Sequence, residues 1–175
     1  PNLKILCGGE TFPPGLAKYL ATRSYSVWNV YGPTETTIWS SIYRVTGHEH
    51  GPIPIGGPVA NTSIYILGAD RDPVPVNVTG EIYIGGHGLA RGYLNRSELT
   101  AERFVTNWLT PELSPSLYRT GDLGRFRSNG EIEYLGRVDN QVKLRGLRIE
   151  LGEIESVLAA HDDVAEAVVM VSGEG

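Results

Sequence analysis

The chain has one cysteine, Cys7, which excludes an internal disulfide and a zinc site made only of cysteines. It also lacks any apolar run of the length that a membrane span needs, so we expect no membrane association. Positive charge is not in excess, because 15 Lys and Arg stand against 20 Asp and Glu, for a net charge of −5. That balance argues against a protein built mainly to bind nucleic acid. No internal repeat and no low-complexity tract is present.

The composition nevertheless supports a folded domain. Hydrophobic residues are 41% and charged residues 20% of the 175 residues, which is enough to bury a core and excludes disordered and fibrous classes. The 22 glycines and 11 prolines lie between apolar stretches, which indicates short strands joined by tight turns. The chain does not begin with methionine, and an apolar stretch at 164–171 stops close to its end. We therefore expect an internal piece of a longer protein.

Hydrophobic patterning predicts a mixture of strands and helices with one boundary near Asp139. A large body precedes that residue and a small strand-helix-strand lobe follows it. The strands are expected at residues 3–7, 26–31, 36–44, 63–67, 81–84, 141–145 and 164–171, and the helices at residues 13–23, 97–104 and 150–161. Ser128-Asn129-Gly130 predicts a hairpin turn.

The first stretch with chemical potential is 29–37, where a glycine and a proline make a turn between two strands. Asn29 and Tyr31 supply an amide and a flat ring, which suit a nucleobase. Thr34 and Glu35 supply a hydroxyl and a carboxylate, which suit a phosphate and Mg²⁺. A plain β-turn with solvated polar side chains is the alternative.

The second stretch, 80–93, is rich in glycine but lacks the Rossmann and Walker spacings. We therefore favour a strand that ends in a glycine bend with close backbone packing. His87 has no second metal ligand nearby and is expected to be a surface or packing residue.

Two further stretches carry charge. Asp122, at the end of an expected strand, has a carboxylate that can accept two hydrogen bonds from a ribose diol, although this stretch by itself favours an Asp that caps a turn. Four cations lie between Arg137 and Arg148, and they suit a phosphate or a phosphopantetheine arm. A solvated strand face with ion pairs is the alternative for these four.

Taken together, four motifs resemble the adenylate-forming enzymes of the acyl-CoA ligase superfamily. They are NVYGPTETT at 29–37, GEIYIGGHGLARGYL at 80–94, YRTGDL at 118–123 and GRVDNQVKLRGLRIELGEIE at 136–155. Their wording is most similar to amino-acid adenylation domains of non-ribosomal peptide synthetases, and the resemblance covers essentially the whole chain. It implies an α/β fold in which residues 1–138 are the C-terminal portion of the large body, with its distorted β-barrel region. Residues 139–175 would begin the small α+β lobe, with a hinge at Asp139.

The resemblance also implies a nucleotide site. Tyr31 would stack on adenine, Asn29 would bind its exocyclic amine, and Asp122 would hold the ribose hydroxyls. Glu35 would bind Mg²⁺. The residues implied at the ATP or AMP site are Gly9, Glu10, Asn29, Tyr31, Gly32, Thr34, Asp122, Tyr134 and Arg137.

The same resemblance implies a substrate pocket and an approach for phosphopantetheine. The pocket residues would be Leu6, Gly8, Val30, Ile38 and Trp39, and the residues near the pantetheine arm Lys143, Arg145 and Gly146. All five pocket residues are uncharged, and Trp39 is bulky, so we expect a small amino acid, glycine above alanine or cysteine. The alternative is that Trp39 turns into the core and leaves the pocket open.

The implied activity joins an amino acid to AMP with ATP and Mg²⁺ and then transfers it to the phosphopantetheine thiol of a carrier domain, in the cytoplasm. An accessory protein of the MbtH-like kind is a further expected partner. The family's phosphate loop, its amine-binding aspartate and its catalytic lysine are not in this chain, so we expect no catalytic residue in it and no activity alone. Two alternatives remain, an acyl or aryl acid ligase and a non-catalytic docking fragment.

Overall fold

The computed structural model describes residues 2–139, 141–144 and 147–172. The chain is a mixed α/β structure that divides into two compact units, Pro1–Val138 and Asp139–Gly175. That the break at Asp139 works as a hinge stays a prediction.

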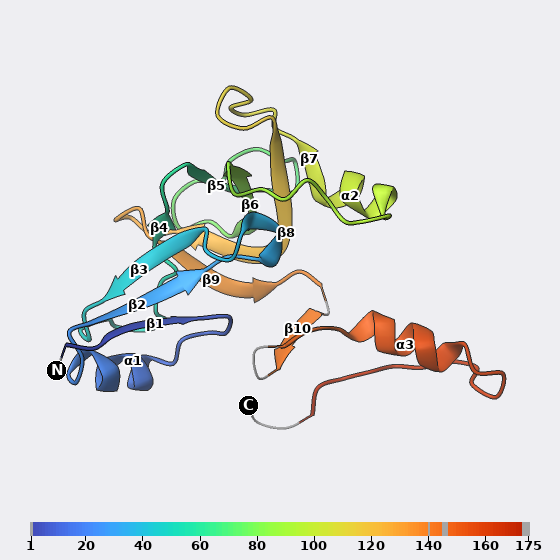
Figure 1. Ribbon diagram of the computed structural model, residues 1–175, viewed down its shortest axis with the longest axis horizontal. Helices are drawn as coiled ribbons and strands as arrows, with labels where there is room; N and C mark the ends of the chain where they lie inside the picture. Colours follow the sequence, from blue (N-terminus) through green and yellow to red (C-terminus); the bar gives the residue numbers. More distant parts are fainter. Residues whose placement is uncertain (1, 140, 145–146, 173–175) are drawn as a thin grey trace. The chain divides into compact units, whose positions relative to one another are not determined.

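The first sheet of the larger unit carries the parallel pair of strands in Figure 1. Strands β1 (Lys4–Gly8) and β2 (Ser26–Tyr31) run parallel and are joined through helix α1 (Pro14–Ala21). Strands β3 (Ser41–Val45) and β4 (Gly57–Pro58) continue the sheet in antiparallel order. Pro14 lies in the first turn of α1, where a missing N–H costs nothing. The helix buries Ala17 against Val27 and Val45.

The second sheet is antiparallel and forms the β-rich region expected from the sequence. Its order is β5 (Thr62–Leu67), β6 (Gly80–Gly86), β8 (Ser116–Phe126) and β7 (Phe104–Thr106), and β9 (Ile132–Arg137) pairs with β8. The short helix α2 (Ser97–Arg103) precedes β7. The 128–130 turn joins β8 to β9, as predicted.

The two sheets of the larger unit share one core. Tyr31 of β2 packs among six buried isoleucines, which are Ile55, Ile64, Ile66, Ile82, Ile84 and Ile132. Hydrogen bonds from Ile55 N–H to the Ile132 carbonyl (2.8 Å) and from Ile132 N–H to the Gly56 carbonyl (2.9 Å) join the same regions. This contact brings the end of β2 close to β8 and β9.

The smaller unit consists of the hairpin β10 (Gln141–Leu144) and β11 (Leu147–Glu150), followed by helix α3 (Leu151–Ala159). The strand predicted at 164–171 is wrong, because these residues form no strand ladder with any part of the chain that the structure describes. Val169 N–H donates instead to the Glu155 side chain, at 2.9 Å. None of the described helices has the length and apolarity required to cross a bilayer.

A second correction concerns the strand predicted at 36–44. Residues Thr34–Thr36 form a 3₁₀ turn, η1, and β3 begins only at Ser41. Thr37 and Ile38 have φ of 61° and 68°, in the left-handed region that a strand cannot use.

Candidate functional site

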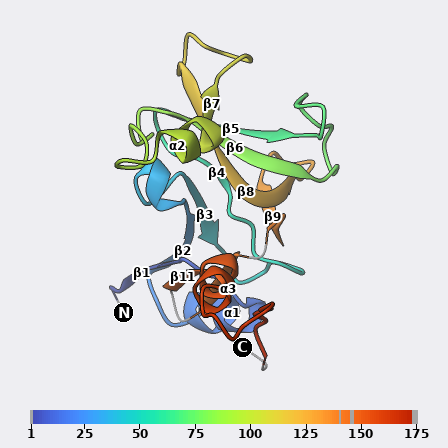
Figure 2. The ribbon, with the colours of Figure 1, turned by 90° about the vertical axis from the view of Figure 1, so that its right-hand side faces the viewer.

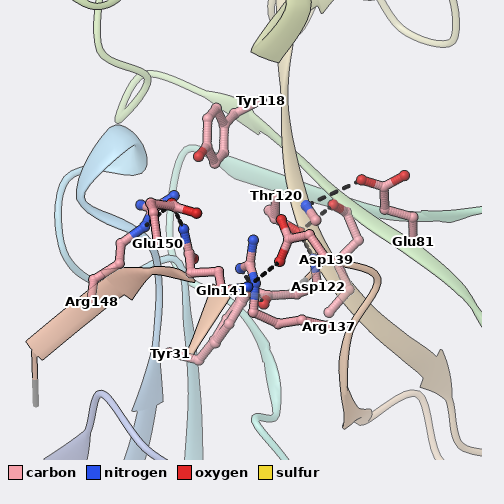
Figure 3. Close-up of polar contacts among 12 residues, drawn as sticks. Tyr31, Glu81, Tyr118, Thr120, Asp122, Arg137, Asp139, Gln141, Arg148 and Glu150 are labelled. Carbon is pink, nitrogen blue, oxygen red and sulfur yellow. Dashed lines mark hydrogen bonds and ion pairs between the residues drawn. The ribbon is translucent and has the colours of Figure 1, made fainter. Parts of the chain in front are cut away.

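Asp122 lies at the centre of a buried polar cluster in the larger unit (Figure 3). Its Oδ1 accepts a hydrogen bond from Arg137 Nη1 at 2.8 Å, and its Oδ2 accepts one from Tyr31 Oη at 2.6 Å. The three residues come from β8, β9 and β2, and Tyr31 is 91 positions from Asp122 in sequence. The sequence placed Asp122 at a strand end, which is wrong, because it lies inside β8.

The Asp122 carboxylate is paired with a cation and can still accept further hydrogen bonds. The Asp122 and Arg137 side chains are only 4% and 8% exposed, so this ion pair is largely withdrawn from water. Burial and then the Asp122 carboxylate raise the pKa of Tyr31, which keeps its phenol a donor. A carboxylate has about four acceptor positions, and the two contacts above use two of them. The remaining two suit a vicinal diol.

The neighbouring aromatic and amide groups are those expected near a nucleobase. The Tyr134 ring is half-buried and lies 6.2 Å from the Tyr31 ring, at a tilt of 43°. Asn29 is buried and donates through Nδ2 to the Pro54 carbonyl at 2.8 Å. No hydrogen bond to its Oδ1 is present among the described residues, and this oxygen is the kind of acceptor that an exocyclic amine requires. The roles of all three toward adenine stay predictions.

Glu35 is held in the η1 turn and is 7% exposed. Its Oε1 accepts from Tyr93 Oη at 2.7 Å, and its backbone carbonyl accepts from Ala90 N–H at 2.8 Å. Figure 2 shows the light-blue η1 turn beside the green loop that precedes α2. Burial, followed by bonds to Tyr118 and Glu35, raises the pKa of Tyr93. Sequence reasoning missed Tyr93, although it lies within the 80–94 motif.

The donor set around Glu35 fits a magnesium ion that is shared with phosphates. Within the described ranges, no group of three His, Cys, Asp or Glu side chains is placed to hold a metal. Mg²⁺ commonly takes only one or two carboxylates and completes its shell with phosphate oxygens and water. The buried carboxylate of Glu35, with the exposed Thr34 one residue before it, meets that requirement.

Comparison with known proteins identifies the family. The model for AMP-binding enzymes matches residues 1–94. The chain belongs to the AMP-binding enzyme family. The dimodular nonribosomal peptide synthase of Bacillus subtilis is 50% identical over 170 residues, which cover 97% of this chain and 7% of that protein. The chain thus spans a small part of this relative.

Solved structures narrow the comparison to adenylation domains of non-ribosomal peptide synthetases. An artificially fused adenylation-PCP di-domain from Klebsiella oxytoca superposes with a TM-score of 0.85, at 27% identity, over 98% of this chain and 32% of that one. A four-domain synthetase bound to AMP and glycine has a TM-score of 0.72 at 47% identity, over 99% of this chain and 13% of that one. The fold is therefore a portion of the adenylate-forming fold, as expected.

The glycine-rich stretch forms a strand that ends in a glycine bend with close backbone packing, as predicted. Gly86 has φ of 120°, and a Cβ there would lie 2.2 Å from the Asn61 carbonyl oxygen. His87 is exposed. Glu81, in the same stretch, is a polar group that sequence reasoning missed, and it binds Arg119 and the Gly121 amide.

The residues implied in the substrate pocket lie at the ends of β1 and β2 and after η1. Gly8 pairs with Val30 across the parallel strands, and Val30 is buried. Leu6 and Ile38 are exposed, and Trp39 is 50% exposed. The alternative in which Trp39 turns into the core is therefore wrong. Whether these side chains meet a substrate stays a prediction.

The remaining residues implied by the resemblance lie after β1, after β2 and in the smaller unit. Gly9 and Glu10 are exposed directly after β1, and Gly32 lies between β2 and η1. In the smaller unit Lys143 pairs with Arg148 across the hairpin, and Asp139 Oδ1 accepts from Gln141 N–H at 3.3 Å. The Gln141 side chain donates to Glu150 (Figure 3). Arg145 and Gly146 lie outside the described residues, so the pantetheine approach stays a prediction.

Proposed function

We propose that this chain is part of an amino-acid adenylation domain of a non-ribosomal peptide synthetase. The amino-acid carboxylate attacks the α-phosphorus of ATP, pyrophosphate leaves, and an aminoacyl-AMP forms. A phosphopantetheine thiol on a peptidyl carrier domain then attacks the acyl carbon and AMP leaves. The reaction is proposed for the cytoplasm, with an MbtH-like protein as an accessory partner.

The observation that carries this proposal is the buried Asp122 cluster. Its two spare acceptor positions suit the ribose diol, and Arg137 neutralises the carboxylate without using both of its oxygens. Such a site needs no protein nucleophile, because positioning and charge neutralisation account for most of the catalysis in transfers at phosphorus. When bound, Mg²⁺ would neutralise phosphate charge, and Glu35 is the residue that would hold it.

Glycine is the proposed amino acid. The pocket residues are uncharged, so they provide no partner for a charged substrate side chain. The exposed Trp39 occupies space that a larger side chain would need, which selects by exclusion. The solved relative bound to AMP and glycine, at 47% identity, supports the same choice.

The test is amino-acid-dependent exchange between ATP and pyrophosphate, measured on the complete adenylation domain that contains this chain. Twenty amino acids, acetate and benzoate are compared at equal concentration. Glycine should give the highest exchange. Exchange with acetate or benzoate alone would favour an acyl or aryl acid ligase, and no exchange with any acid would contradict the adenylation proposal. A preference for an aromatic or charged amino acid would contradict glycine only.

A further inference from the structure

Glu81 makes a contact that none of the nucleotide roles above explains. Its Oε1 accepts from the backbone N–H of Gly121 at 3.1 Å, and both carboxylate oxygens accept from Arg119 Nε at 3.0 Å. The Glu81 side chain is only 13% exposed, so its charge is largely withdrawn from water. Gly121 is the residue directly before Asp122.

The contact sits where the ladder between β6 and β8 is interrupted. Glu81 pairs with Leu123 and Tyr83 pairs with Arg119, so residues 120–122 lie opposite the single residue Ile82. Such a bulge leaves backbone groups without ladder partners. Side chains replace them: Thr120 Oγ1 donates to the Ile82 carbonyl at 2.7 Å and accepts from Asp122 N–H at 2.9 Å. Glu81 serves the Gly121 amide in the same way (Figure 3).

Gly121 is consequently fixed on both sides. Its φ of 76° lies in the left-handed region. Its N–H is held by Glu81, and its carbonyl accepts from Val138 N–H at 2.9 Å. The direction in which the backbone enters Asp122 therefore depends on the Glu81 carboxylate.

We propose that Glu81 is a positioning residue for nucleotide binding, because it holds the Gly121 amide and so aims the Asp122 carboxylate at the ribose. This inference rests on the proposed function. Arg119 assists by orienting the carboxylate, since its Nε contacts both Glu81 oxygens, and a charged acceptor makes the stronger hydrogen bond. Burial alone would lower the pKa of Arg119, but the bond to Glu81 and its charge raise it. Without Glu81 the 120–122 segment is free to shift, and small displacements of a binding group are costly.

The experiment compares three variants of the complete adenylation domain in the exchange assay, with KM measured separately for ATP and for the amino acid. Glu81→Ala removes the acceptor and should raise KM for ATP about tenfold, as expected for one lost hydrogen bond to a charged group. KM for the amino acid should change less than twofold. Glu81→Gln keeps an acceptor oxygen and should recover part of the loss.

The third variant tests whether Glu81 acts by holding the Gly121 amide or only by forming an ion pair with Arg119. The double exchange Glu81→Arg with Arg119→Glu restores opposite charges but leaves no acceptor at position 81 for the Gly121 amide. KM for ATP should stay raised in it. Recovery to the wild-type value would overturn the proposal, as would an unchanged KM for ATP in Glu81→Ala or an equal rise in both KM values.

Glu133→Gln is the matched control. Glu133 is also buried and bonded to two arginines of β8 and the turn after it, Arg125 and Arg127, at 3.0 and 3.3 Å. Its described side-chain contacts involve no backbone amide of the bulge. Loss of this pair should lower stability while both KM values stay within twofold of wild type.

A measurement that does not depend on activity tests the proposal even if the proposed function is wrong or Glu81→Ala folds poorly. Amide hydrogen exchange at Gly121 should be about tenfold faster in Glu81→Ala than in wild type, and unchanged in Glu133→Gln. If Glu81→Ala does not fold, the Glu81→Arg and Arg119→Glu double variant replaces it. Unchanged exchange at Gly121 in the folded variant would overturn the positioning role whatever the substrate.

Discussion

Both the stability of the domain and the proposed nucleotide binding depend on the carboxylate of Asp122. Asp122→Asn keeps the shape but removes the buried ion pair with Arg137, which should cost about 3 kcal/mol. Tyr31→Phe removes only one hydrogen bond and should cost about 1 kcal/mol. Urea unfolding of the complete domain checks both values. Equal midpoints for the two variants would show that the Asp122–Arg137 pair adds nothing beyond a neutral hydrogen bond.

Glu35 allows a test of the metal assignment. Glu35→Gln keeps an oxygen that can accept from Tyr93 but removes the charge, so the Mg²⁺ concentration for half-maximal exchange should rise severalfold. The exposed Glu112→Gln is the control and should leave the Mg²⁺ dependence unchanged. An identical metal dependence in wild type and Glu35→Gln would leave Glu35 with a structural role only.

Trp39 decides the proposed size limit of the substrate. Trp39→Ala should open the pocket and raise exchange with alanine, valine and leucine relative to glycine by about tenfold, since a methylene or two in a pocket changes selectivity by that order. Trp108→Ala is a matched control, because Trp108 is also exposed, at 40% against 50% for Trp39, but packs edge-on against Tyr83. The proposed pocket is wrong if both variants keep the wild-type preference.

The sequence predicted Tyr31, Asp122 and Arg137 as site residues, which stays a prediction, but it did not predict that they bind one another. Nothing in the local pattern could connect Tyr31 to a residue 91 positions away. Glu81 and Tyr93 were missed for a similar reason. The partner of Glu81 is a backbone amide left free by a bulge, and the partner of Tyr93 is a carboxylate in a different motif. Neither contact can be predicted from the sequence before it is known which strands pair.

At the scale of elements, the predictions succeeded where hydrophobic period and turn chemistry agreed. Helix α1, strand β2 and the 128–130 turn formed close to the expected bounds. The strand expected at 36–44 began late because tertiary contacts overrode β-propensity. Ser40 N–H donates to the Tyr31 carbonyl at 2.7 Å, which closes the η1 turn back onto β2. A Cβ on Gly32 would lie 2.5 Å from the Ile38 carbonyl oxygen, so this closure requires glycine.

The loop after β3 supplies a prediction on pH. Partial burial alone would raise the pKa of Glu49, but bonds from Thr46 N–H, the Thr46 hydroxyl and Tyr43 lower it from 4.5 to about 2. A lowered folded-state pKa means that ionised Glu49 stabilises the fold fully above about pH 4.5 and loses this effect as the pH falls toward 2.

Glu49→Gln should therefore destabilise the domain by about 1 kcal/mol at pH 7, a value kept small because the group is only partly buried. The difference from wild type should shrink as the pH falls below 4.5 and vanish only below about 2, as measured by urea unfolding across that range. The exposed Glu98→Gln serves as the control and should show no such trend. A difference independent of pH would mean that the carboxylate charge is not what holds the loop.

At the scale of the whole molecule, the four motifs predicted the fold class because their order and spacing hold along nearly the entire chain. Residues 164–171 have strand-like composition, but a strand requires a backbone partner, and the described residues provide none. Similarly, Ile154, Val157 and Leu158 have helical spacing on α3, yet all three are exposed. The hydrophobic period predicted the helix correctly, but it does not show which residues pack against the apolar face of the helix.

The break between Val138 and Asp139 leads to the last prediction, which concerns the two half-reactions. If Asp139 is a hinge, its backbone must take different φ values as the smaller unit changes orientation between adenylation and thioester formation. Asp139→Pro fixes φ near about −65° and restricts Val138 as well, so it should favour one orientation. We expect one half-reaction to fall about tenfold more than the other. Exchange with pyrophosphate measures the first, and transfer of a labelled amino acid to the carrier domain measures the second.

Ser128→Pro, in the turn between β8 and β9, is the matched control, because proline suits the second position of a turn and both half-reactions should survive. An equal loss of both half-reactions in Asp139→Pro, with Ser128→Pro active, would contradict the hinge.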